Sequence, residues 1–243
     1  MAMYRGKKQY RKVHPKIFVW SHTQKAEIEY FQDFKNHLRS TLLMPKKDIC
    51  WTPQELLEKI TQWKNKNICE EDNDQVWCIF DVDDFYRNGR NELIKAVENA
   101  SRNNIKIAYT NECFELWILL HFMKPTSAIS RGKNIEKKIQ NEFKKHKLGE
   151  FKKNQKVFNI LLQFQSIAVK NAIDILPKYN DNNWEEKLSE RGNPSTSLHF
   201  LVDEINRLSG MIKSNNKMFC KRPGTADCVN GDPSKRRFLR KSI

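Results

Sequence analysis

Clustered carboxylates at the end of a short apolar segment are the groups of this sequence best suited to chemistry. Residues 76–80 read Val-Trp-Cys-Ile-Phe, which favours a buried β-strand, and Asp81, Asp83 and Asp84 follow directly. Because alternate side chains of a strand share a face, Asp81 and Asp83 point the same way, with Cα atoms roughly 7 Å apart. Two like charges this close are tolerated if one is protonated or a cation lies between them. Carboxylate oxygens suit a hard ion such as Mg²⁺, so the pair predicts a divalent-metal site.

Further candidate groups lie between the first predicted strand and the first predicted helix. His22 carries a titratable ring that can bind a metal or move a proton, and Lys25 is a candidate phosphate contact. Glu27 lies one turn into the helix. An ordinary surface loop explains these three residues equally well, so both interpretations are open at this point.

Glu115 and His121 belong to a nearly apolar segment that is predicted to be helical. They are six residues apart, which places them about 240° from each other around a helix axis, so they cannot share one face. Glu115 lies in the first turn, where the helix dipole favours an anion, and is either a metal- or substrate-orienting group or a plain helix-start acid. His121 is predicted to be a core histidine.

The charge of the whole chain points to an anionic partner. The 243 residues include 44 Lys and Arg against 29 Asp and Glu, a formal net charge of +15, which favours nucleic acid or an anionic surface. A soluble, lysine-rich protein from an AT-rich genome would have the same composition. The densest basic segment interleaves Phe143, Phe151 and Phe158 with lysines, and predicts either contact with a phosphate backbone or a solvated helix face. Its candidate nucleic-acid-binding residues are Lys144, Lys145, Lys152, Lys153 and Lys156.

The predicted elements alternate between strand and helix. Predicted strands cover residues 16–20, 48–51, 76–82 and 105–109, and predicted helices cover residues 23–40, 53–65, 91–103 and 113–123. This order favours an α/β fold with a mostly parallel sheet and helices on both faces. Ligands of such sheets collect outside the carboxyl ends of the strands. We therefore expect Ser21, His22, Asp81, Asp83, Thr110 and Asn111 to share one edge.

Four regions are expected along the chain. Residues 1–15 form a basic arm, 16–124 the α/β core, 125–210 a helical extension packed on the core, and 211–243 a basic tail with the composition of a disordered segment. Helices of the extension are predicted over residues 135–146, 156–176 and 196–209, after a turn at 193–197.

The expected compartment is the cytoplasm. The basic N-terminus lacks the apolar stretch of a secretory signal, and no segment approaches the ~20 apolar residues of a membrane-spanning helix. The six cysteines form no C-x-x-C pair, and three lie in apolar contexts typical of small core residues. Cys220 and Cys228 are weaker candidates for pairing or metal binding.

Taken together, these segments resemble the RloB family of restriction-linked and abortive-infection proteins, whose core is TOPRIM-like. The resemblance is carried by residues 27–31, 76–85, 111–122 and 193–199, and its most specific stretch is Cys-Phe-Glu-Leu-Trp at 113–117. It implies a divalent-metal phosphodiester site in which Asp81 and Asp83 bind the metal. It also implies that Glu27 matches the second acid of the loop after the first strand.

The chain departs from the family pattern in that loop. His22 stands where the family has Glu, Thr23 where it has Gly, and Ala26 where it has Thr; Glu112 stands where it has Pro. Imidazole also binds metals and accepts protons, so His22 either substitutes for the glutamate or leaves a weakened site. An imidazole ligand prefers ions softer than Mg²⁺, which makes Mn²⁺ a candidate beside it.

The sequence and the resemblance lead to one functional hypothesis and its alternatives. The first is a Mg²⁺- or Mn²⁺-dependent nuclease that acts on RNA, tRNA included, or on DNA in anti-phage defence. Asp81 and Asp83 hold the metal, Glu27, Glu115 or His22 completes the site or moves a proton, and lysines hold the backbone. The alternative is a nucleic-acid- or partner-binding module that is catalytically weakened at His22. A basic surface that serves only assembly with an acidic partner is the third hypothesis.

The expected partners follow from the same hypotheses. They are nucleic acid and an ATPase of the AAA or ABC type, because related defence loci encode an ATPase beside the TOPRIM protein. A second copy of the chain is a further candidate, and no membrane is expected. The sequence has no Walker motif, so any ATP hydrolysis would come from a partner.

Overall fold

The computed structural model describes residues 15–21, 26–40, 42–46, 52–67, 73–82, 89–130, 132–153, 155–176 and 183–219, with side chains described as far as Gly210. The chain divides into two units, Met1–Ser209 and Gly210–Ile243. The first unit contains the sheet and the helices that position the candidate site.

A mostly parallel sheet forms the centre of this unit, as expected, and the described residues give it five strands. Its order is β2-β1-β3-β4-β5. The strands are β1 (Ile17–Ser21), β2 (Leu43–Lys46), β3 (Gln75–Asp81), β4 (Ile105–Asn111) and β5 (Ser195–Thr196). The first four are parallel, and only the two-residue β5 runs antiparallel, against the end of β4. Because both faces of a parallel sheet are covered, β3 is apolar on both sides rather than alternating, which explains the continuous run at 76–80.

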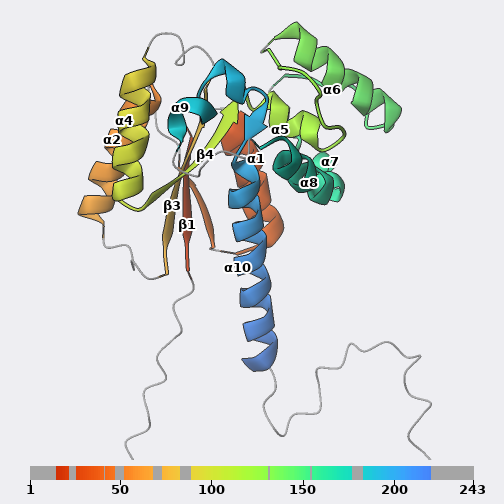
Figure 1. Cartoon of the computed structure of the whole chain (residues 1–243). Coiled ribbons are helices and arrows are strands. Elements are labelled where there is room, and N and C mark those ends of the chain that lie inside the picture. Colours follow the sequence, from red (N-terminus) through yellow and green to blue (C-terminus); the bar gives the residue numbers. More distant parts are fainter. Residues whose placement is uncertain are drawn as a thin grey trace, which may run out of the picture. The chain divides into compact units, whose positions relative to one another are not determined.

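One face of the sheet packs against two helices, α2 (Pro53–Lys66) and α4 (Arg90–Arg102) (Figure 1). Alternate β3 residues supply the contact: Val76, Cys78 and Phe80 belong to one buried apolar cluster with Leu57 of α2 and Val97 of α4. Helix α2 begins as the sequence predicts. The Thr52 side chain accepts a hydrogen bond from the Glu55 backbone N–H at 3.2 Å, and Pro53 is the first helical residue.

Helix α1 (Ala26–Leu38) and most of the remaining helices belong to the opposite side of the sheet (Figure 1). Aromatic contacts tie them together: the Tyr30 ring of α1 meets Phe114 and Phe158 edge to face at 5.8 and 5.1 Å. The other elements here are α5 (Glu115–Leu120), α6 (Lys133–Lys145), α7 (Phe158–Leu161), α8 (Gln165–Ile175) and α10 (Leu198–Phe219). The short α9 (Trp184–Lys187) precedes β5.

Several predicted elements differ from the structure. Strand β2 (Leu43–Lys46) was not predicted, because its Pro45 is atypical of strands; proline is tolerated here because β2 is an edge strand. The single helix predicted over 156–176 is α7 and α8 with a 3₁₀ turn, Leu162–Phe164, between them. The helix predicted to end at 209 continues to Phe219. The turn predicted at 193–197 contains β5, which is too short for a periodic signal.

Some predictions fall on residues outside the described ranges. These are the basic arm over 1–14, the strand at 48–51, most of the loop with His22 and Lys25, the acids Asp83 and Asp84, the tail over 220–243, and Cys50, Cys69, Cys220 and Cys228. Within the described ranges, Cys78 and Cys113 are buried core residues, as expected. No helix in these ranges is both long enough and apolar enough to cross a membrane.

Candidate functional site

Two buried carboxylates belong to the carboxyl edge of the sheet. Asp81 is the last residue of β3, and Glu27 lies in the first turn of α1, shortly after β1 ends at Ser21. Strands β1 and β3 are parallel neighbours, with Ser21 opposite Ile79, so both carboxylates lie at the same end of the strands. Each of the two residues is only 2% exposed.

The direction of the Asp81 side chain follows from the alternation along β3. Val76, Cys78 and Phe80 point to the side of α2 and α4, so the odd-numbered residues, Asp81 among them, point to the side of α1. Glu27 and Asp81 therefore belong to one face of the sheet as well as one edge. Transfer of an ionised carboxylate out of water is unfavourable unless a cation or hydrogen bonds compensate it, so two such groups together are typical of a functional site.

The neighbouring strand adds polar groups beside Asp81. Thr110 of β4 is the register partner of Asp81, and the Val82 N–H donates to the Thr110 carbonyl at 2.9 Å, which continues the ladder past the acid. The Thr110 hydroxyl lies 3.3 Å from the hydroxyl of Thr196. Thr196 also donates to the Tyr109 carbonyl at 2.9 Å and accepts from the Leu198 N–H at 3.2 Å. This buried network fixes the end of β4 and therefore the backbone beside Asp81.

Asn111 was expected to share the edge with the acids, and its side chain has another role. Its amide donates to the Ser189 carbonyl at 2.8 Å and to the Lys187 carbonyl at 3.3 Å. It thereby ties the end of β4 to the end of α9, on the side of the sheet where Tyr109 contacts Trp184. Asn111 is thus a buried structural residue, because its amide supplies hydrogen bonds to two backbone carbonyls.

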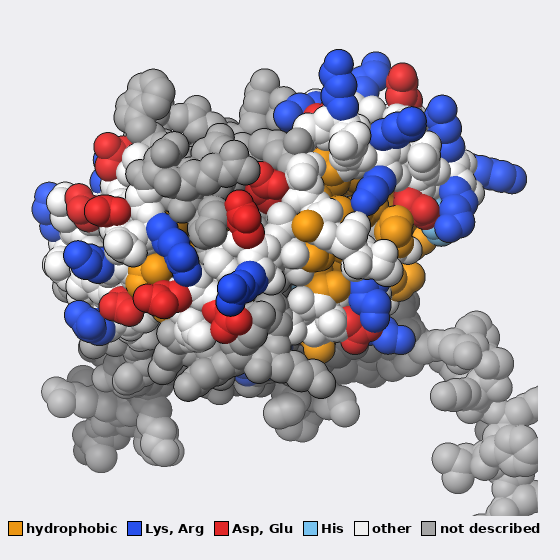
Figure 2. All heavy atoms as spheres, turned by 45° about the horizontal axis from the view of Figure 1, so that its top comes forward, with side chains coloured by type: hydrophobic (Ala, Val, Ile, Leu, Met, Phe, Trp, Pro, Cys, Tyr) orange, Lys and Arg blue, Asp and Glu red, His pale blue; other side chains and the backbone are white. Residues whose placement is uncertain are grey.

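The lysines of the basic segment are exposed, and some of them form ion pairs. Lys145 pairs with Glu142 at 3.3 Å, Lys153 with Glu136 at 3.4 Å and Lys156 with Asp33 at 3.9 Å. The ammonium groups of these pairs are exposed to solvent, so they are accessible to a phosphate. Lys144 and Lys152 are also exposed. Figure 2 shows Lys and Arg side chains gathered at the upper right, over the region of α6.

Comparison with known proteins identifies the family. A family model described as RloB-like protein matches residues 17–205. The chain belongs to the RloB-like family. No curated protein and no solved structure matches it. The RloB-like match runs from β1 into α10 and therefore includes Glu27, Asp81, Glu115 and the polar segment around Thr196.

The described part of this RloB-like chain supplies two of the predicted metal ligands. Glu27 and Asp81 offer buried carboxylate oxygens, the donor type that Mg²⁺ and Mn²⁺ prefer, so they fit a divalent ion in chemistry and burial. Among the described residues, no group of three or more His, Cys, Asp and Glu side chains could hold a metal. The other predicted contributors, Asp83 and His22, lie outside those residues, as does the predicted phosphate contact Lys25.

The two candidates on the apolar segment separate as the helix geometry predicts. Glu115 is half-buried and is the first residue of α5, four residues beyond the end of β4. His121 is completely buried, and its Nδ1 lies 2.8 Å from the Trp117 carbonyl. Burial lowers the pKa of His121 to about 4, so the ring is neutral near pH 7. The prediction of a core histidine is confirmed.

The sequence interpretation missed the role of residues 195–197. Ser-Thr-Ser was predicted to be a turn and a helix cap, yet these hydroxyls hold β4 at its carboxyl end: the Tyr109 N–H donates to Ser197 Oγ at 3.0 Å. A run of three small hydroxyl residues before an apolar helix is the sequence signal that points to such a role.

Proposed function

We propose that this chain is a divalent-metal-dependent nuclease that hydrolyses phosphodiester bonds of RNA, tRNA included, or of DNA. The proposed setting is anti-phage defence, with the chain as the effector of an ATPase partner. Membership of the RloB-like family supports this class of protein. The observation that carries the proposal is the burial of Glu27 and Asp81 on one face and at one edge of a parallel sheet, where α/β proteins bind their ligands.

The proposed chemistry divides among the residues at this edge. Asp81 and Glu27, with Asp83, would hold Mg²⁺ or Mn²⁺ through carboxylate oxygens. The bound ion would supply Lewis-acid stabilisation of the phosphate charge and lower the pKa of a bound water. His22 and Glu115 are the proposed proton-handling groups, because an imidazole can accept and donate a proton and Glu115 is a half-buried carboxylate at the start of α5.

The proposed substrate contacts are the lysines. Lys25 precedes α1 in the sequence. The exposed lysines on α6 and in the segment after it are Lys144, Lys145, Lys152, Lys153 and Lys156. Their attraction to phosphates does not depend on base identity, which is why RNA and DNA are both retained as substrates. A steep fall of affinity with salt is expected for such contacts.

The test is cleavage of tRNA and plasmid DNA with Mg²⁺ or Mn²⁺, comparing the wild type with Asp81→Asn and Glu27→Gln. Either substitution is expected to lower cleavage at least about 100-fold, since even residues that only orient metal ligands contribute 10- to 100-fold. Asp174→Asn is the control, because Asp174 is an acid of α8 whose ion-pair partner, Lys124, is not among the proposed substrate contacts. Cleavage that survives both edge substitutions would contradict the proposal.

A catalytically weakened binding module is the second candidate, and the histidine at position 22 favours it. This function predicts metal-independent nucleic-acid binding without cleavage. His22→Glu restores the residue expected from the family resemblance and separates the two functions. A gain of cleavage in this variant, from a silent wild type, would assign the weakness to His22.

A further inference from the structure

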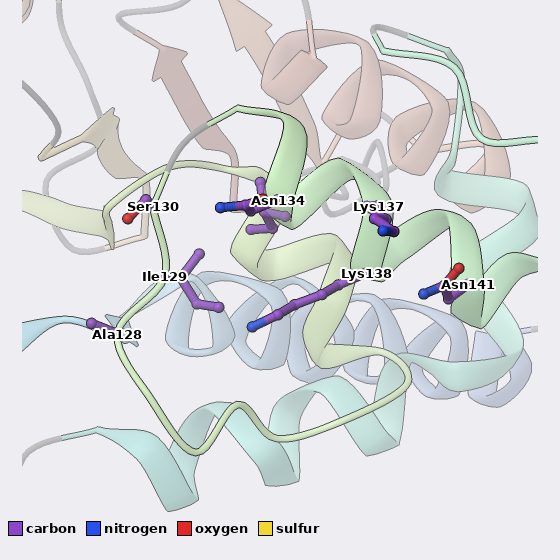
Figure 3. A pocket seen from close by; sticks show the side chains of 8 residues that line it. Ala128, Ile129, Ser130, Asn134, Lys137, Lys138 and Asn141 are labelled. Atoms are coloured by element: carbon purple, nitrogen blue, oxygen red, sulfur yellow. The ribbon is translucent and has the colours of Figure 1, made fainter.

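A cavity beside α6 lies outside the candidate metal site. It has a volume of about 310 Å³ and is lined by Ala128, Ile129, Ser130, Asn134, Ile135, Lys137, Lys138 and Asn141. Figure 3 shows Lys138 reaching from α6 toward the segment that carries Ile129. Ligand pockets start near 300 Å³, so the cavity has room for one small ligand and no more.

The polar wall of the cavity is one stripe of α6. Asn134, Lys137, Lys138 and Asn141 are spaced i, i+3, i+4 and i+7, which places them together on a helix. Ile135, Ile139 and Phe143, on another stripe, are buried in the protein. The cavity therefore combines two ammonium groups and two amides with a floor that includes Ile135.

The charge of this wall is not neutralised within the described part of the chain. No described residue that lines the cavity is acidic, and no described carboxylate lies within ion-pair distance of Lys137 or Lys138. The neighbouring acid of the helix, Glu136, pairs with Lys153 instead. Two lysines that line one cavity, with no described counter-charge, create a positive potential there, and an anion relieves their mutual repulsion.

The opposite wall is held in place by one asparagine. The Asn193 side chain accepts from the Ile129 N–H at 2.9 Å and donates to the Ile129 carbonyl at 2.7 Å, so the segment 128–130 is fixed by two hydrogen bonds. A wall that is fixed before binding loses less entropy when a ligand arrives.

The same asparagine links the cavity to the sheet edge. Two residues after Asn193, Ser195 pairs with Asn111, and the next residue, Thr196, pairs with Thr110, the register partner of Asp81. Two residues span at most about 7 Å of chain, so the cavity wall and the end of β4 are close neighbours. A nucleic-acid strand bound at the candidate metal site would therefore have only a short distance to cover to reach the cavity.

We propose that this cavity binds the phosphate of a nucleotide, with Lys137 and Lys138 as the charge partners and Asn134 and Asn141 as neutral donors. The nucleotide is either one unit of a single-stranded nucleic acid or a free nucleotide. Ammonium groups bind phosphate as point charges, and amides donate to its oxygens or to a base edge. The inference deepens the proposed function and rests on it for the expectation that a strand lies across both sites.

The test measures binding with metal excluded by EDTA, so that it does not depend on cleavage. The probes are a fluorescein-labelled single-stranded oligoribonucleotide, followed by polarisation, and AMP, followed by calorimetry. Lys137→Gln/Lys138→Gln in the full chain is expected to raise Kd about tenfold for at least one probe. The matched control is Lys95→Gln/Lys170→Gln, which removes equal charge from exposed positions of α4 and α8.

The two probes distinguish the sources of the phosphate. A loss confined to the oligoribonucleotide assigns the cavity to a strand, and its salt dependence should become shallower by about 0.7 per lost contact. A loss confined to AMP assigns it to a free nucleotide. Equal losses of affinity in the cavity variant and its control would show a bulk charge effect and overturn the proposal. Unchanged affinity in both variants would also overturn it.

Folding and function have separate controls. Asn134→Ala/Asn141→Ala keeps the charge of the cavity and is expected to raise the Kd for the same probe about threefold. This variant replaces the lysine variant as the test if thermal unfolding shows that the lysine variant is less stable than the wild type. A wild type that binds but never cleaves would contradict the proposed nuclease and leave the cavity result standing. If the wild type cleaves nucleic acid and neither cavity variant changes binding, the proposed nuclease stands and the proposed cavity site is contradicted.

Discussion

The two faces of the sheet are built for different tasks, although the same strands supply both. On the side of α2 and α4, residues of β1, β3 and β4 join one apolar cluster that contains Phe80. On the side of α1, the next residue of β3, Asp81, is just as inaccessible and carries a carboxylate. The comparison teaches that burial alone does not separate core from site. Core and site are distinguished by the chemical type of the buried group and by its position at the end of a strand.

The difference extends to the hydrogen bonds at the edge. Apart from the Asn111 amide at its end, the apolar face packs by shape complementarity, whereas the other face has to satisfy hydroxyls and backbone groups in a buried position. Thr196, which contacts Tyr109, Thr110 and Leu198, carries much of this task. The polar face therefore depends on a segment far away in sequence, and the apolar face depends mainly on periodic helices.

The largest expected contrast is between the neighbours Phe80 and Asp81. Phe80→Ala should lower the free energy of unfolding by about 3–5 kcal/mol, since it leaves a cavity in the apolar cluster. Asp81→Asn should leave the free energy of unfolding unchanged or higher while it abolishes metal-dependent cleavage, because it removes a buried charge. Urea unfolding and the nuclease assay, run on both variants, check this. Comparable losses of stability in both would break the distinction between the faces.

The next effect concerns pH and the buried His121. Its pKa is about 4 in the folded chain and near 6.5 when unfolded, so the unfolded state binds the proton first as the pH falls. Its contribution is fully present above pH 6.5 and is lost progressively down to about pH 4, by about 3 kcal/mol. His121→Gln should flatten this part of the stability profile, as measured by urea unfolding at a series of pH values. If the slope of stability against pH is unchanged in this variant, groups other than His121 cause the loss of stability in acid.

The smallest effect should come from the polar network at the edge. Thr196→Val keeps the shape and removes the hydroxyl, so the Leu198 N–H loses an acceptor and the Thr110 hydroxyl a partner. The expected loss of stability is about 1–3 kcal/mol, by thermal or urea unfolding. Cys78→Ala, in the apolar cluster, is the companion variant that removes a small side chain and no hydrogen bond of this network. A neutral Thr196→Val would show that the edge does not depend on this hydroxyl.

Much of the fold was predictable because its signals are local. The apolar run before Asp81 predicted a buried strand, and Thr52-Pro53 predicted the start of α2 within one residue. Strand β2 was missed because Pro45 is atypical of strands and is acceptable only at the edge of the sheet. Strand β5 was missed because two residues have no period.

The sequence by itself determined that acids follow β3, that Glu27 lies in the first helix near its start and that the chain is strongly basic, because residue types and their spacing are local properties. Only the tertiary structure decided that Glu27 and Asp81 share a face and an edge, that Asn111 is used to hold α9, and that Asn193 links the α6 cavity to β4. These facts depend on strand order and register, which are set by contacts between residues far apart in the chain.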